Sequence, residues 1–97
     1  MAAYLVFIRE GAVRDTDAMA QYSKTARAAD GEGIKMSPLV VYGGIEALEG
    51  QPADGLVIMQ FDTAEDAKRW YNRPGYLDAV PHRQKGADYR VMMVEGL

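Results

Sequence analysis

Four segments of the chain carry apolar residues at both odd and even positions. Successive side chains of a strand point to opposite faces of a sheet, and a strand with one face in water alternates apolar with polar residues. The pattern therefore predicts strands that need cover on both sides. These strands are Ala3–Arg9, Met36–Tyr42, Leu56–Phe61 and Tyr89–Glu95.

Two other segments repeat apolar residues at intervals of three and four, which is the spacing of one helix face. The first helix is predicted over Thr16–Ala29, with Asp15 as its N-cap. The second opens at Thr63, where Asp66 three residues later completes a capping-box pattern. It is predicted to stop before Pro74, because proline disfavours helix in the preceding residue and lacks the N–H that continues the ladder.

Glycines and prolines mark the irregular segments. Gly43-Gly44 predicts a β-bulge or a sharp bend, after which Ile45–Leu48 is expected to continue in extended form. Beyond the second helix, Gly75–Val80 is expected to form a short extra turn, and Pro81 to start another at His82–Lys85.

The elements follow the order strand, helix, strand, strand, helix, strand. This order predicts an α+β protein of the ferredoxin-like plan, in which both helices cover one face of a four-stranded antiparallel sheet. At 97 residues the chain is expected to be one domain, residues 1–97.

Two helices shield only one face of such a sheet, yet apolar side chains are expected on both faces. A bare second face would forfeit about 25 cal/mol for each Å² of apolar surface and invite aggregation. Because a two-fold dimer is the commonest remedy, we expect a homodimer joined sheet face to sheet face, a dimeric α/β barrel.

Composition excludes several function classes. The net charge is −3 and no basic stripe appears, which argues against nucleic acid as a partner. The absence of cysteine excludes disulfides, thiolate chemistry and cysteine-based metal sites. The N-terminal apolar run is too short for a signal peptide or membrane span, so we expect a cytoplasmic protein without a membrane partner.

The chain resembles the domain of unknown function 1330 family of the dimeric α/β-barrel superfamily, over nearly its whole length. The features that carry the resemblance are Arg9 at a strand end, Tyr42–Gly44, Leu48–Gly50, the Leu56–Phe61 strand, Trp70-Tyr71-Asn72, Pro74 with Tyr76, Arg83 and Val94-Glu95-Gly96. The resemblance implies a ferredoxin-like protomer, a dimer and a small pocket between sheet and helices. It implies no reaction, although related families include cofactor-free monooxygenases, isomerases, cyclases and haem-degrading enzymes. The chain departs from the family pattern at Pro81-His82.

His82 and Arg83 are the candidate catalytic residues. His82 is the only imidazole, and the ordinary pKa of a histidine, about 6.5, suits a general acid or base. The alternative, a surface histidine at the start of a turn, is favoured by the pattern. Arg83 is suited to bind a carboxylate or enolate oxygen. Its alternative is a structural ion pair with Glu95, Asp78 or Asp88.

Six further residues are candidates for substrate binding, and each has a packing alternative. Trp70 is expected in the core or pocket wall, and Tyr71 and Tyr76 present hydroxyls or pack at a helix end. Arg9 is either an anion site or a rim ion pair. Tyr22 and Tyr42 are expected to meet the same cavity.

The sequence therefore predicts a small dimeric protein with an aromatic-lined pocket. As an enzyme it would act without a cofactor, by proton transfer or oxygenation of a small aromatic or enolic/carboxylate substrate. The alternative is a non-catalytic ligand-binding, structural or regulatory dimer. One histidine and no cysteine argue against a transition-metal site, and no phosphate-binding loop or catalytic triad is present, so we expect neither metal nor cofactor.

Overall fold

The computed structural model describes residues 1–97 and contains four strands and three helices. Their order is β1 (Ala3–Glu10), α1 (Thr16–Ala28), β2 (Ser37–Val41), β3 (Gly55–Phe61), α2 (Ala64–Tyr71), α3 (Pro74–Gly86) and β4 (Asp88–Glu95). The strands form one antiparallel sheet in the order β2-β3-β1-β4. This confirms the ferredoxin-like α+β plan, with one helix more than the sequence predicts.

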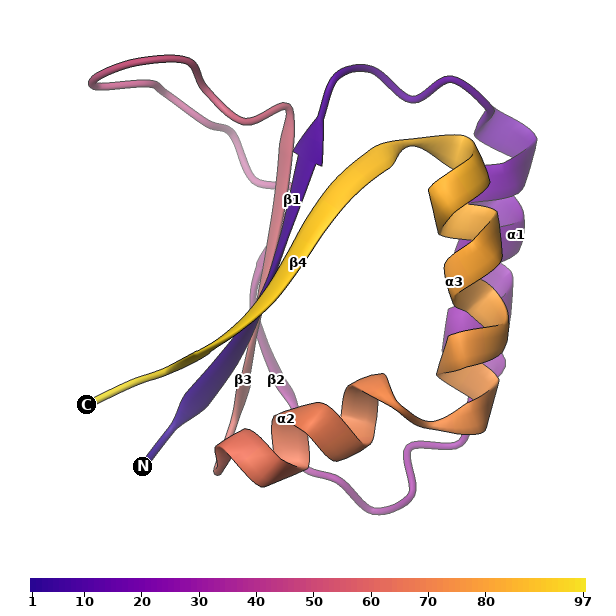
Figure 1. Cartoon of the computed structure of the whole chain (residues 1–97), viewed down its shortest axis with the longest axis vertical. Helices are drawn as coiled ribbons and strands as arrows, with labels where there is room; N and C mark the ends of the chain where they lie inside the picture. The colour runs from indigo at the N-terminus through magenta and orange to yellow at the C-terminus, as the bar shows by residue number, and fades with distance from the viewer.

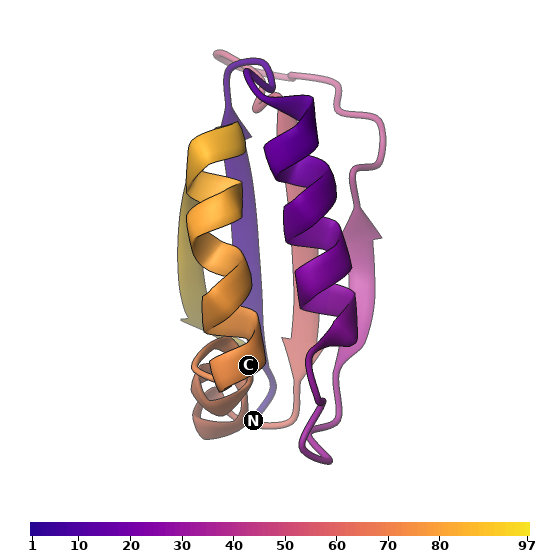
Figure 2. The same ribbon diagram turned by 90° about the vertical axis from the view of Figure 1, so that its right-hand side faces the viewer.

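All three helices lie on the same side of the sheet (Figure 1). α1 and α3 pack side by side and run along the strands, while α2 closes one end (Figures 1 and 2). No Cα atom of α1 comes within 8 Å of a strand Cα, so this helix stands away from the sheet. Large side chains fill part of the intervening layer, and the candidate site occupies the rest.

The core lies between α2, α3 and the inner face of the sheet. Leu5 of β1 pairs with Met59 of β3 and Met93 of β4, which places the three side chains on the same face. The buried cluster consists of Ala3, Leu5, Phe7, Met59, Phe61, Ala67 and Tyr76. The cluster thus joins β1, β3, α2 and α3, and partly buried apolar residues of α1 and β4 pack against it.

The helix starts follow the capping signals of the sequence. The Asp15 carboxylate accepts a hydrogen bond from the backbone N–H of Ala18 at 2.9 Å, so Asp15 is the N-cap of α1. The Thr63 hydroxyl accepts from the N–H of Asp66 at 3.0 Å and caps α2 in the same way. Both predicted caps are confirmed.

The two short turns predicted after Pro74 are wrong, because α3 is one continuous helix with Pro81 inside it. Pro74 suits a helix start, since its fixed φ is already helical and its missing N–H would have no partner there. Pro81 faces solvent. The opposite face of α3 buries Tyr76 and Arg83, and this packing outweighs the disruption that the interior proline causes.

The extended continuation predicted for Ile45–Leu48 is also wrong. β2 ends at Val41, and Tyr42 takes a left-handed conformation with φ of 54° that turns the chain out of the sheet. Residues 42–54 form a long exposed loop that stands out on the side away from the helices (Figure 1). The register irregularity lies between Pro38 and Val40, upstream of the expected Gly43-Gly44.

The outer face of the sheet is apolar and has no helix over it. Val40 pairs with Ile58, Ile58 with Val6, and Val6 with Met92, so one row of apolar residues crosses all four strands. Apolar side chains on both faces were predicted, and the structure confirms them. None of the three helices combines the length and hydropathy needed to cross a membrane.

Candidate functional site

A cavity of about 270 Å³ lies between the inner face of the sheet and the helices. Six aromatic residues line it: Phe7, Tyr22, Tyr42, Trp70, Tyr76 and Tyr89. The rest of the wall is Ser23, Ala26, Met36, Pro38, Val41, Val57, Met59 and two arginines, Arg27 and Arg83. The lining is therefore apolar and aromatic, and its only formal charges are positive.

Arg83 is the buried charge of this cavity. Its side chain reaches from α3, and the residue is only 4% exposed. Its Nη2 donates to the Tyr71 hydroxyl at a long 3.4 Å, and no protein atom accepts from its Nε. The guanidinium carbon lies 5.4 Å from the ring centre of Tyr89, 5.8 Å from that of Tyr22 and 5.9 Å from that of Phe7. Aromatic faces thus surround the cation.

The structural ion pair that the sequence offered for Arg83 does not form. No salt bridge in the protein includes Arg83, and Asp88 instead pairs with Arg14 at 2.9 Å. Asp78 and Glu95 are exposed residues outside the cavity lining. The guanidinium is therefore buried without a carboxylate.

Two pairs of tyrosine hydroxyls meet at the cavity wall. The Tyr22 and Tyr76 oxygens are 2.8 Å apart, and those of Tyr42 and Tyr89 are 2.6 Å apart. Burial raises the pKa of Tyr22, Tyr42 and Tyr76 above the usual value for a phenol. These hydroxyls stay protonated at neutral pH, so they offer hydrogen-bond donors and not bases.

A second arginine, Arg73, holds the Trp70 side of the cavity in place. Its guanidinium carbon lies 4.2 Å from the centre of the Trp70 ring. Its Nε donates to the Trp70 carbonyl at 2.8 Å, and its Nη1 donates to the Asp30 carbonyl at 2.9 Å. Arg73 therefore ties the start of α3 to the segment that follows α1.

The structure brings five of the eight candidate residues together around the cavity. These are Tyr22, Tyr42, Trp70, Tyr76 and Arg83. Arg9 lies elsewhere: it donates to the carbonyls of Gly11 and Asp54 at 3.2 and 2.7 Å and holds the foot of the 42–54 loop. The ion pair that the sequence offered does not form, and the anion site at Arg9 stays a prediction.

His82 is half-buried on α3 and is not among the residues that line the cavity. Adjacent helical residues point about 100° apart, so a helix that directs Arg83 inward turns His82 away from it. Its role as an acid or base stays a prediction without geometric support here.

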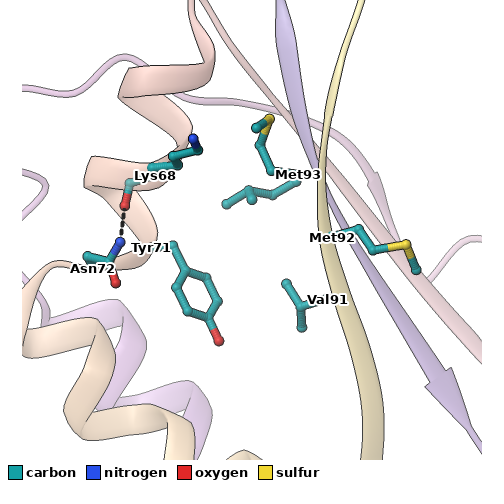
Figure 3. A pocket seen from close by; sticks show the side chains of 7 residues that line it. Lys68, Tyr71, Asn72, Val91, Met92 and Met93 are labelled. Carbon is teal, nitrogen blue, oxygen red and sulfur yellow. Dashed lines mark hydrogen bonds between the residues drawn. The ribbon is translucent and has the colours of Figure 1, made fainter.

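Tyr71 lies between the cavity and a separate groove of about 250 Å³ beside β4 (Figure 3). Its ring stands between α2 and β4, and its hydroxyl receives the Arg83 hydrogen bond. The groove is lined by Leu5, Lys68, Tyr71, Asn72, Val91, Met92 and Met93. The Asn72 side chain is occupied with the Lys68 carbonyl at 2.9 Å. Lys68 is the only charged residue that lines the groove, so the groove has fewer groups that could bind a ligand than the cavity has.

Sequence reasoning named five of the fifteen lining residues, and Tyr89, Met36 and Arg27 are among those that it missed. Tyr89 was assigned only to a strand, although its aromatic ring on the same face as Phe7 and Val91 is a usable signal. Met36 and Arg27 carry no local signal, because their approach to the cavity depends on how α1 and β2 are placed. No group of three or more potential metal-ligating side chains occurs in the protein.

The strand order and the cavity beneath the long helices define an α+β protein of the ferredoxin-like class. Within that class, the chain belongs to the family described as Domain of unknown function (DUF1330), whose model matches residues 2–97. The resemblance noted in the sequence is thereby confirmed. No curated protein matches the sequence.

Three solved structures illustrate how widely the fold is shared. The RPA0582 protein of unknown function from Rhodopseudomonas palustris matches with a TM-score of 0.70 and 18% identity, over 99% of this chain and 82% of its own. A dimeric protein of unknown function with a ferredoxin-like fold from Bacteroides fragilis matches with a TM-score of 0.57 and 13% identity, over 98% and 96%. SnoaB from Streptomyces nogalater, a cofactor-independent oxygenase, matches with a TM-score of 0.50 and 12% identity, over 99% and 91%. At these identities the likeness concerns the fold.

Proposed function

We propose that the protein binds a small, largely aromatic organic molecule in the cavity between its sheet and its helices. The observation that carries the proposal is the lining, in which six aromatic residues surround a space of about 270 Å³. Small-molecule sites are typically concave and apolar with a few placed polar groups, and this cavity has that composition. A cavity of about 150 Å³ is enough to hold benzene, so there is room here for an aromatic ring with substituents.

The mouth of the cavity is on the side of α1 and β2. Of the lining residues, Arg27 on α1 and Pro38, Val41 and Tyr42 at β2 are exposed. α1 and β2 lie at the same edge of the molecule, α1 in the helix layer and β2 in the sheet (Figures 1 and 2). A ligand that enters here reaches Arg83 and Trp70 at the inner wall.

Binding, and not a particular reaction, is the function that the lining supports. SnoaB provides a precedent for oxygenation on this fold without a cofactor. In this chain the lining contains no carboxylate and no imidazole, and its buried phenols hold their protons. Proton transfer or oxygenation would therefore need a substrate that ionises by itself. Cofactor-free oxygenation is the second candidate function. Oxygen uptake during incubation with phenols and β-keto acids is the measurement that tests it.

The emission of Trp70 provides the test of binding, because it is the only tryptophan and it lines the cavity. Titration with substituted phenols, aromatic acids and β-keto acids is expected to change its fluorescence saturably. Ala26→Phe, which fills the cavity from α1, should abolish the change. Ala20→Phe, an exposed position on the same helix, is the matched control and should retain it. Equal titrations in the two variants, or no saturable change with any compound, would reject the proposal.

We also propose that the protein is a homodimer joined through the outer face of its sheet. The supporting feature is the apolar row from Val40 to Met92, which no part of the protomer covers. The 42–54 loop projects on this same side and exposes Ile45 and Leu48. A fold relative from Bacteroides fragilis is described as dimeric.

A further inference from the structure

We propose that the ligand of the cavity is an organic monoanion, such as an aromatic carboxylate or an ionised enol or phenol, whose charged group binds to Arg83. The inference rests on the proposed function and specifies its ligand. Its starting point is a mismatch of charge: the protein as a whole carries −3, whereas the cavity lining holds two arginines and no carboxylate.

Burial without a partner makes Arg83 unusual. A buried charge is costly unless it is paired and hydrogen-bonded. Arg73 shows how the same chain satisfies such a group: it is 5% exposed, and two of its nitrogens donate to backbone carbonyls. Arg83 is 4% exposed, yet its Nε has no acceptor and its one hydrogen bond is long. An acceptor on the ligand would supply the hydrogen-bond partner that Arg83 lacks.

The free hydrogen-bonding capacity of Arg83 matches a planar anion. The N–H of Nε and one N–H of Nη2 point the same way in the guanidinium plane, and this edge carries only the 3.4 Å contact to Tyr71. A carboxylate accepts two parallel hydrogen bonds from such an edge. Because Nε is covered by protein atoms, the side chains around it must shift to admit the ligand oxygen. The rings of Tyr22 and Tyr89 beside the cation would flank the charged group and the aromatic body behind it.

A single buried cation selects a single charge. A neutral ligand would leave the guanidinium uncompensated, and a second negative charge would be desolvated without a partner. Arg27 is exposed at the mouth, where solvent and salt screen its charge. It attracts anions to the entrance but does not hold a second one in the interior.

Matched acids and amides test the inference. Benzoate and naphthoate are titrated against Trp70 fluorescence beside benzamide and naphthamide, which have nearly the same shape without the charge. The wild type is expected to bind each acid about 10- to 100-fold more tightly than its amide. Arg83→Met should remove this preference and leave the amide affinity within about threefold, and Arg83→Lys should retain part of it, since it keeps the charge and loses the fork. Arg69→Gln removes an exposed arginine outside the cavity and should change nothing.

The absorbance of para-nitrophenol provides a second readout, because its ionised form has a distinct visible band. Arg83 should lower the pKa of the bound phenol, so that the complex shows the anion at a pH where the free compound is mostly neutral. The band should disappear in Arg83→Met.

The outcomes separate this inference from the proposed function. If acids and amides bind equally in the wild type and in Arg83→Met, and bound para-nitrophenol is neutral, the cavity binds ligands but the anion site is wrong. If no compound binds in any variant, both the proposed function and this inference fail. Circular dichroism of each variant confirms that it is folded before its titration is interpreted.

Discussion

At the scale of single residues, Arg73 and Arg83 show how equal burial leads to different roles. Arg73 lies at the start of α3, where a Trp70 ring and two backbone carbonyls satisfy its guanidinium. Arg83 lies ten residues, or nearly three turns, further along the same helix and faces aromatic rings and a cavity. The first arginine stabilises the fold, whereas the second lacks a partner at the expense of stability, which is the basis for the proposed anion site.

This contrast predicts opposite effects of the same substitution. Arg73→Met should lower the free energy of unfolding by about 2–3 kcal/mol, because hydrogen bonds to a charged group and the contact with Trp70 are lost. Arg83→Met should raise it by about 1 kcal/mol, because an uncompensated buried charge is replaced by an apolar side chain. Urea denaturation of both variants at one protein concentration is the measurement. A comparable loss in Arg83→Met would show that Arg83 is a structural residue.

The candidate residues that sequence analysis placed correctly are those whose type alone restricts their position. Trp70, Tyr76 and Tyr22 are large aromatics on helix faces, and such side chains pack inward. The orientation of His82 depends on the direction of a helix that the sequence broke into two turns. The direction of the Arg9 side chain depends on its hydrogen bond to the Asp54 carbonyl at the end of the 42–54 loop, a contact that has no signature in sequence.

At the scale of elements, α3 supplies Tyr76 and Arg83 to the cavity wall and is the helix that sequence propensity hides. Pro81 argues against a helix across this segment, whereas Pro74 suits only its start. The buried positions Tyr76, Ala79 and Arg83 nevertheless follow three- and four-residue spacing, and they pack against the rest of the protein. Propensity gave the wrong answer here because tertiary packing decides short segments of mixed preference.

Pro81 should therefore cost stability that an alanine would restore. In Pro81→Ala the new N–H can donate to the carbonyl of Leu77 four residues earlier, and we expect the free energy of unfolding to rise by about 1–3 kcal/mol. Thermal unfolding followed by circular dichroism measures the change. Pro52→Ala, in the exposed loop, is the control and should lower stability slightly by loosening the unfolded chain. An unchanged or lower midpoint for Pro81→Ala would mean that α3 depends on its proline.

The strands were more predictable than the connections. A run such as Leu56–Phe61 combines β-branched and apolar residues between turn signals, and the strand appears at Gly55–Phe61. The 42–54 loop was read as partly extended because Ile45 and Leu48 are apolar. No strand pairs with that segment in the protein, and pairing partners are not visible in a local pattern.

At the scale of the whole molecule, the protein is a sheet that helices cover on one face only. The inner face has the helices, the core and the cavity, while the outer face presents Val6, Ile58 and Met92 in a continuous row. The sequence predicts this asymmetry from counting alone, since it holds more apolar strand positions than its helices can cover. What covers the outer face is not part of the protomer, and we propose that it is the same face of a second protomer.

Two lysine substitutions, one on the outer face of the sheet and one on the helix side, test which surface forms the proposed dimer interface. Met92 on the outer face is 41% exposed, and Leu77 on the helix side is 42% exposed. Light scattering of the wild type at micromolar concentration is expected to give twice the protomer mass of 10.7 kDa. Met92→Lys places charges across the proposed two-fold interface, where like charges repel and lose their hydration, so its mass should fall toward that of one protomer on dilution.

Leu77→Lys introduces the same charge at the same exposure and should remain dimeric. A wild type of protomer mass would remove the proposed assembly, and dissociation by Leu77→Lys with an intact Met92→Lys dimer would move the interface to the helices.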